Sequence, residues 1–317
     1  MRDDDLRQKA LALLEAEERA KALAAAVPPA RLFVAVALTP VLFSQYTVFP
    51  DFLHVRKVSN APGIVHIAPA ADIARSDWMG AARYAPSIEA EIAVGDSDND
   101  SENLLLDLAW HAAALIKLRG HTSLLCPAIS TVSWDVVASF KDGSVVFRML
   151  DDIPRSILLI EDESPLTTAD MDWVKTNFKP ALKLRGRNIS RRFGLAFELA
   201  YTCNHSNSPR ITLANIWVAL EALFGRRDDF RGSATKKISD RIAAWIPGAS
   251  STDVQHLYDA RCAAVHGRAQ TQKEAVKAAR DSYSILKQAL TRAIETGEIP
   301  LPDEPKPTSS QANEAST

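Results

Sequence analysis

The chain has 317 residues, of which 47% are apolar, and it carries 37 Lys and Arg against 39 Asp and Glu. That length and apolar content can fill two ordinary hydrophobic cores, and no run of uncharged apolar residues is long enough to cross a membrane. The three cysteines, Cys126, Cys203 and Cys262, are widely spaced without a C-x-x-C pair. This usage favours a reducing cytoplasm and excludes a disulfide framework.

Residues 1–27 are predicted to form an Ala-rich, highly charged helix. Asp3, Asp4 and Asp5 open this segment and no apolar run follows them, so the segment is not typical of a signal peptide. The helix is expected to end at Pro28-Pro29, because proline cannot continue it.

Residues 28–163 are predicted to form an α+β domain around a small sheet. Short β-rich runs alternate with breaks that contain proline. The runs are residues 32–38, 47–58 and 64–67, and the breaks fall at Pro40, Pro50 and Pro62-Gly63. Residues 104–118 have the apolar spacing of an amphipathic helix between the strands. We expect this domain to act as a sensor, although the sequence does not identify its trigger.

A hairpin is expected near the end of the same domain. Residues 133–140 and 144–150 flank Lys141-Asp142-Gly143, and an Asp-Gly pair supplies the positive φ angles that tight turns require. A further strand is expected at residues 156–160.

Residues 165–296 are predicted to form an all-α bundle, followed by a disordered tail at residues 297–317 that is rich in Pro, Glu, Ser and Thr. Glu221 borders the apolar face of one predicted helix, and Arg241 borders the face of the next. An unpaired buried charge costs several kcal/mol, so we expect Glu221 to pair with Arg241 or with Arg261. The sequence leaves both partners open.

Residues 257–267 place an arginine, a histidine and a stop signal on the last turns of a helix. Val254, Leu257 and Tyr258 recur at helical spacing, and Arg261 falls in the same stripe, so its side chain should face the interior or a cleft. His266 comes just after this stripe and before Gly267, and glycine is favoured at a helix C-terminus because it adopts the left-handed conformation without strain.

This segment resembles the R-x4-H signature of the HEPN superfamily, most closely the Y-x-x-R-x-x-x-x-H-G motif of its ApeA-like branch. Two upstream segments are similar to other helices of that family, in the expected order. Residues 216–224 resemble its L-E-x-L helix and residues 237–243 its K-I-x-x-R-I helix. The resemblance covers about residues 165–296. It implies a metal-independent endoribonuclease without a cofactor, acting as a homodimer in antiviral defence or a stress response.

Arg261 and His266 are the catalytic residues that the resemblance implies. A neutral imidazole can take the proton of a 2′-hydroxyl so that this oxygen attacks the adjacent phosphate, while a guanidinium stabilises the charge that develops on the phosphoryl oxygens. Catalytic family members usually carry a polar residue directly after the arginine, where this chain has Cys262. Asp259 shares a helix face with His266 and can take over the role of orienting the imidazole. Tyr258 completes the predicted site.

The motif has two other interpretations. An arginine and a histidine near a helix C-terminus both favour the negative end of the helix dipole, so the motif can serve capping and packing alone. The bundle would then be a noncatalytic module for dimerisation or for RNA or nucleotide binding. A cysteine-nucleophile triad or a metal site built from Asp259, Cys262 and His266 is disfavoured, because adjacent helical turns hold these side chains parallel and further ligands are missing.

Positive charge is concentrated in the predicted bundle. Residues 165–295 carry 21 Lys and Arg against 12 Asp and Glu, while the rest of the chain carries 16 against 27. Such basic runs can contact the phosphates of a nucleic acid. The predicted RNA-binding residues are Arg191, Arg192, Lys236, Lys237 and Arg268. The alternative is a solvated helix surface that is balanced by the acidic N-terminal half.

Overall fold

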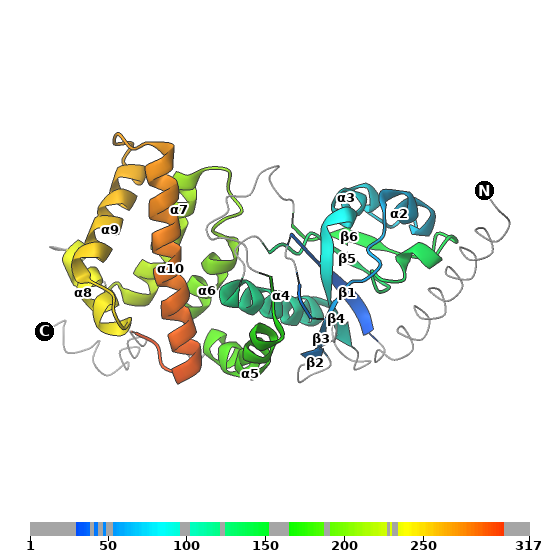
Figure 1. Cartoon of the computed structure of the whole chain (residues 1–317), viewed down its shortest axis with the longest axis horizontal. Helices are drawn as coiled ribbons and strands as arrows, with labels where there is room; N and C mark the ends of the chain where they lie inside the picture. The colour runs from blue at the N-terminus through cyan, green and yellow to red at the C-terminus, as the bar shows by residue number, and fades with distance from the viewer. Residues whose placement is uncertain are drawn as a thin grey trace, which may run out of the picture. The chain divides into compact units, whose positions relative to one another are not determined.

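The computed structural model describes residues 30–38, 41–43, 47–48, 53–95, 102–120, 124–151, 165–186, 191–226, 229 and 234–300. These residues belong to two compact units (Figure 1). The first, which we call the sheet unit, comprises the residues up to Phe178 together with the short segment Asn204–Asn207. The second, which we call the helical unit, comprises Lys179–Cys203 and the residues from Ser208 onward. The chain is therefore α+β. The predicted helix at residues 1–27, the predicted strand at 156–160 and the tail beyond residue 300 lie outside the described residues.

Within the described residues of the sheet unit, six strands form one antiparallel sheet in the order β2-β3-β4-β1-β5-β6. The strands are β1 (Ala30–Ala37), β2 (Thr47–Val48), β3 (Leu53–Lys57), β4 (Ile88–Gly95), β5 (Ala128–Ser130) and β6 (Phe147–Met149). Almost every residue of β1 and β4 is buried, which explains why β1 appears in the sequence as a continuous apolar run. The strand predicted at residues 32–38 is confirmed, and the run at residues 47–58 becomes the paired strands β2 and β3.

Helices cover the central strands. Helix α4 (Glu102–Arg119) packs against β1 and β4 and confirms the helix predicted at residues 104–118. Its expected amphipathic character is wrong for the second half, where residues 111–118 are all buried. Helices α2 (Ile64–Ala70) and α3 (Trp78–Tyr84) share a second core cluster with side chains of β1 and β4, among them Phe33 and Ala93.

The strand predicted at residues 64–67 is wrong, because this segment forms the first turn of α2. Gly63 is the N-cap, and its backbone N–H donates to the His66 Nδ1 at 3.0 Å. Ile67 and Ala70 are buried in the α2–α3 core cluster. Burial of one helical face therefore outweighs the β propensity of isoleucine and valine.

The hairpin predicted at residues 133–150 is also wrong, although its turn forms. Gly143 has a φ of +68°, and the Asp142 carboxylate accepts a hydrogen bond from the Ser144 hydroxyl at 2.6 Å. Residues 133–140 are not a strand, and β6 pairs with β5 instead. The fully buried Trp134 donates its indole N–H to the Phe33 carbonyl at 3.0 Å, which folds this segment over the sheet.

The helical unit is built around α7. Its helices are the last part of α5 (Thr168–Arg185), then α6 (Arg191–Thr202), α7 (Pro209–Phe224), α8 (Ala234–Trp245), α9 (Ser251–Val265) and α10 (Gln272–Thr296). Helix α7 contacts α6, α8, α9 and α10, and its buried Trp217 donates to the Ser282 hydroxyl of α10 at 3.0 Å. The apolar face predicted for this helix is buried.

The first part of α5 belongs to the sheet unit, so the two units divide at Phe178 rather than near the predicted boundary at residue 164. The Phe178 ring packs edge-on against His111 of α4 with 4.9 Å between centroids. Asp170 also pairs with Arg119 of α4 at 3.3 Å. These contacts hold the beginning of α5 to the sheet unit.

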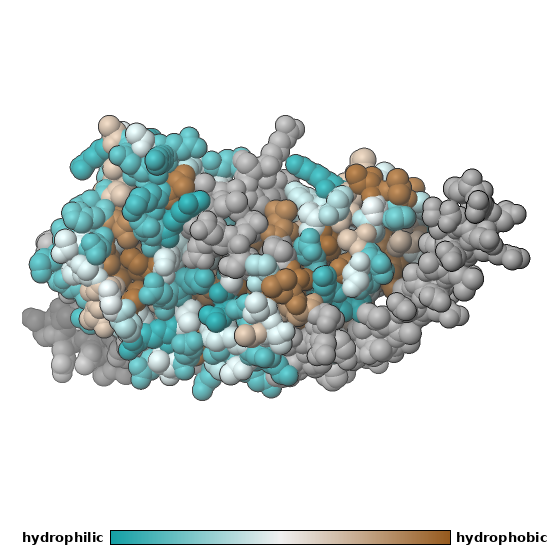
Figure 2. Space-filling model, in the orientation of Figure 1, coloured by the Kyte–Doolittle hydropathy of each residue, from teal (hydrophilic) through white to brown (hydrophobic). Residues whose placement is uncertain are grey.

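Apolar side chains gather on the surface over α2 and α3 (Figure 2). Ile64, Val65, Ile73 and Met79 are each more than half exposed. No helix among the described residues is both long and apolar enough to span a membrane.

Candidate functional site

Helix α9 carries the arginine and histidine of the motif and ends as the sequence predicts. His266 is the C-cap, and its backbone N–H donates to the Cys262 carbonyl at 3.0 Å. Gly267 follows with a φ of +66°, and the Arg268 backbone N–H turns back to the Ala263 carbonyl at 3.0 Å. The left-handed glycine predicted at this position is confirmed.

Arg261 lies against Glu221 of α7. Its Nη2 is 3.1 Å from the Glu221 Oε1, and only 19% and 17% of the two side chains are exposed. The guanidinium carbon also lies 5.4 Å from the centroid of the Tyr258 ring. Of the two partners that the sequence left open for Glu221, the structure selects Arg261.

Tyr258 supports this ion pair from the core. Its ring packs edge-on against Trp217 with 5.0 Å between centroids. Burial, and secondarily the nearby Glu221 carboxylate, raises the pKa of the Tyr258 hydroxyl. Tyr258 therefore stays neutral at physiological pH.

Arg241 pairs with Asp229, which the sequence did not single out. Its Nη1 and Nη2 donate to the two Asp229 carboxylate oxygens at 2.5 and 2.8 Å, and Nη1 also donates to the Phe224 carbonyl at 2.8 Å. The hydrogen bond from Arg241 is the main cause that lowers the pKa of the Asp229 carboxyl to about 2. This bidentate pair fastens the end of α7 to α8.

His266 follows Arg261 by five positions, with four residues between them. In an α-helix this spacing turns two side chains about 140° apart around the helix axis. The His266 imidazole is exposed, whereas Arg261 is mostly covered. Of the supporting residues, Asp259 is exposed and Cys262 is half-buried. In the described part of the chain, no three His, Cys, Asp or Glu side chains are grouped to hold a metal ion.

Most of the predicted RNA-binding residues lie around the C-terminal end of α7, which we call the α7–α8 corner. Arg192 donates to the Gly225 carbonyl at 2.6 Å, and the Lys237 ammonium is 4.0 Å from Asp229. Lys236 pairs with Asp240 at 3.1 Å, and Arg191 is exposed at the start of α6.

The fifth predicted RNA-binding residue, Arg268, lies at the other end of α7. Helix α7 has 16 residues, so its ends are about 24 Å apart. The side chain of Arg210, at the start of α7, donates to the Gln270 carbonyl at 2.7 Å, which joins this end of α7 to the loop that follows His266. We call the surface formed by Arg210, His266, Arg268, Gln270 and Lys273 the α9–α10 corner.

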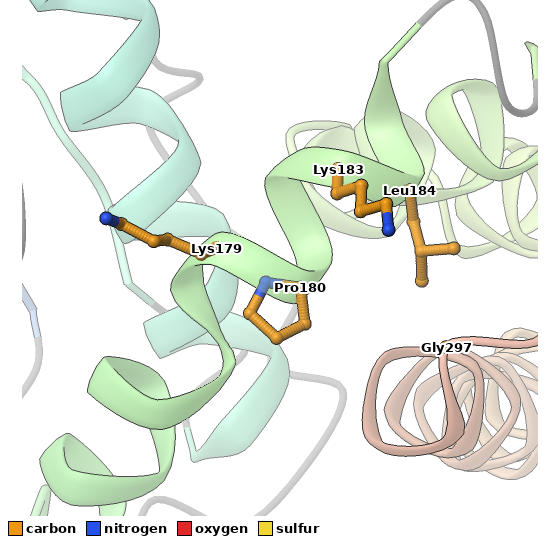
Figure 3. A pocket seen from close by; sticks show the side chains of 5 residues that line it. All are labelled: Lys179, Pro180, Lys183, Leu184 and Gly297. Carbon is orange, nitrogen blue, oxygen red and sulfur yellow. The ribbon is translucent and has the colours of Figure 1, made fainter.

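The described part of the helical unit also has an open pocket of about 590 Å³ at Gly297. Lys179, Pro180, Lys183 and Leu184 of α5 line it (Figure 3). Neither Arg261 nor His266 is among its lining residues, so the predicted site is an exposed helix end and not this pocket.

The sheet unit contains a buried polar network that the sequence did not indicate. The Glu91 carboxylate, which is fully buried on β4, accepts hydrogen bonds from Arg56 Nε at 2.5 Å, from the Ser133 hydroxyl at 3.0 Å and from the Trp134 backbone at 2.7 Å. The Asp135 carboxylate accepts the backbone N–H groups of Ser59 and Asn60 at 2.6 and 2.8 Å. This network fastens the loop after β5 to β3 and β4.

No protein-family model, curated protein or solved structure matches this chain. The HEPN resemblance therefore rests on the motif residues alone.

Proposed function

We propose that the helical unit is a HEPN-like domain that acts as a metal-independent endoribonuclease, with His266 as general base. The observation that carries the proposal is the exposed imidazole of His266, which the left-handed Gly267 and the Arg268 turn hold at the end of α9. Two exposed arginines, Arg210 and Arg268, lie at the same end of the bundle. A base that is open to solvent and surrounded by cations suits a polyanionic substrate.

In the proposed reaction, His266 takes the proton of a ribose 2′-hydroxyl. The 2′ oxygen then forms a bond to the adjacent phosphorus, the bond from phosphorus to the 5′ oxygen breaks, and the leaving 5′ oxygen takes up a proton from solvent water, which reaches this exposed site. The products are a 2′,3′-cyclic phosphate and a 5′-hydroxyl end. Arg261 would stabilise the charge on the phosphoryl oxygens, as guanidinium groups do.

A homodimer belongs to the same proposal. Because Arg261 and His266 leave α9 in directions about 140° apart, one chain does not direct both groups at a single phosphate. A second copy placed against α9 can supply the missing group. The RNA partner, the defence role and the cytoplasmic location are part of this proposal and come from the motif resemblance and the cysteine usage.

A second candidate is a noncatalytic module that dimerises or binds RNA or a nucleotide. The ion pair of Arg261 with Glu221 favours it, because a guanidinium that already has a carboxylate partner has less charge to offer a phosphate. Under this interpretation, Arg261 stabilises the contact between α7 and α9 and has no role in chemistry.

The test is cleavage of a mixed RNA substrate in EDTA by the full-length protein and by His266→Ala. His256 provides a matched control, because it is an exposed histidine on the same helix. We expect the wild type and His256→Ala to leave 5′-hydroxyl ends, and His266→Ala to lose cleavage with an unchanged melting temperature. RNA binding without cleavage by the wild type would favour the module, and cleavage that survives in His266→Ala would refute the assignment of the base.

A further inference from the structure

The α9–α10 corner brings together basic residues from three helices. Arg210 comes from the first turn of α7, Arg268 follows the end of α9, and Lys273 lies in the first turn of α10. All three side chains and His266 are exposed. Gln270 follows His266 by four residues, so their Cα atoms are at most about 15 Å apart. The hydrogen bond from Arg210 to the Gln270 carbonyl therefore places the start of α7 beside the loop that follows the imidazole.

The loop that carries these residues is well anchored. The Gln270 side chain donates to the Ala260 carbonyl at 3.3 Å, which folds the loop back on α9. Thr271 and Glu274 form a capping box at the start of α10, with the Thr271 backbone N–H donating to Glu274 Oε2 at 2.8 Å. These hydrogen bonds lower the pKa of Glu274, so its carboxylate stays ionised at neutral pH and offsets part of the positive charge of Arg210, Arg268 and Lys273.

Arginine is well suited to bind phosphate at this position. A guanidinium has five N–H donors, and the hydrogen bond from Arg210 to the Gln270 carbonyl uses one of them. The others can form the paired hydrogen bonds that arginine makes with phosphate oxygens. The positive ends of the α7 and α10 dipoles add to the same field, and the negative end of α9 at His266 opposes part of it.

We propose that Arg210, with Arg268, binds the backbone phosphates of single-stranded RNA next to the nucleotide whose 2′-hydroxyl His266 deprotonates. Arg210 lies outside the R-x4-H motif, in a helix 56 residues away along the chain from His266. The α9–α10 corner is then the substrate surface, and Arg210 both anchors the His266 loop and holds the substrate. This inference rests on the proposed endoribonuclease function for its choice of RNA.

The experiment is fluorescence anisotropy of a labelled single-stranded RNA with the full-length protein in EDTA, over a range of salt concentrations. We compare Arg210→Gln, Arg268→Gln and Arg210→Lys with the wild type. Arg280→Gln is the matched control, because Arg280 is an exposed arginine of α10 two turns beyond Lys273. The unlabelled DNA of the same sequence and inorganic phosphate serve as competitors.

We expect Arg210→Gln and Arg268→Gln each to bind RNA about tenfold more weakly, which is the usual effect of losing one charge-assisted hydrogen bond. The slope of log affinity against log salt should fall by about 0.7 for each lost phosphate contact on a single strand. Arg210→Lys should keep most of that slope, and Arg280→Gln should match the wild type.

The outcomes separate this inference from the proposed function. If the wild type does not bind RNA, or if Arg210→Gln binds with an unchanged salt slope, Arg210 only anchors the loop and the inference is refuted. If the salt slope of Arg210→Gln falls as expected but the wild type does not cleave RNA, the RNA-binding surface is supported and the proposed endoribonuclease activity is refuted. Equal competition by DNA would show that the surface reads phosphates and not the 2′-hydroxyl.

Discussion

Replacing Asp229 with asparagine removes the carboxylate that joins Arg241 to the end of α7. The arginine hydrogen bonds lower the pKa of the Asp229 carboxyl from 3.8 to about 2, and a shift of about two units corresponds to roughly 2.5 kcal/mol of stability. The Asp229 side chain is buried, but 25% of the Arg241 side chain is exposed, so solvent screens part of this interaction. We therefore expect Asp229→Asn to lower the free energy of unfolding by about 1–2 kcal/mol at pH 7.

The stability that the Asp229 carboxylate contributes should decrease as the pH is lowered. Because folding lowers the pKa of Asp229, its contribution is complete above pH 4 and disappears as the pH falls from about 4 to about 2. Urea unfolding at pH 7 and at pH 3 should therefore show a smaller difference between wild type and variant at the lower pH. Asp281→Asn is the control, because Asp281 pairs with the exposed Lys277 and should leave the midpoint unchanged. A difference that is the same at both pH values would refute the reasoning.

Substitutions at three further positions test the helical unit. Glu221→Ala should lower the free energy of unfolding by about 1–3 kcal/mol, because it leaves the mostly buried Arg261 without its carboxylate; thermal unfolding checks this, and no loss of stability would show that water replaces Glu221. Gly267→Ala should cost about 1 kcal/mol because φ is +66°, while Gly267→Asn should cost less, since asparagine tolerates this region; equal costs in urea unfolding would contradict the strain argument. Ser282→Ala should cost about 1–2 kcal/mol by leaving the buried Trp217 N–H unsatisfied, and an unchanged melting temperature would argue against that bond.

Features set by neighbouring residues were predictable from the sequence. The periodicity of residues 104–118 and the apolar face that includes Trp217 gave correct helices, because helical spacing depends on the next few residues only. The left-handed conformation of Gly267 and the turn at Gly143 were also predictable, since glycine tolerates positive φ wherever it occurs.

Features that depend on distant partners were not predictable. The Asp142-Gly143 turn forms, but the strand expected before it is replaced by a segment that Trp134 fixes to Phe33, 101 residues earlier. Residues 64–67 form a helix because α2 buries Ile67 in a core that other segments supply. The expected β propensity was real, but tertiary packing outweighed it.

The candidate site shows the same division. The sequence by itself determined that Arg261 faces the interior or a cleft, that His266 ends its helix, and that one of two arginines pairs with Glu221. Only the tertiary structure selected Arg261 for Glu221, assigned Asp229 to Arg241 and brought Arg210 to the loop after His266. The physical reason is that helix faces and caps follow from local backbone geometry, whereas an ion pair or a surface cluster depends on which helices pack together. A contact such as that of Arg210 with a backbone carbonyl 60 residues away leaves no pattern in the sequence.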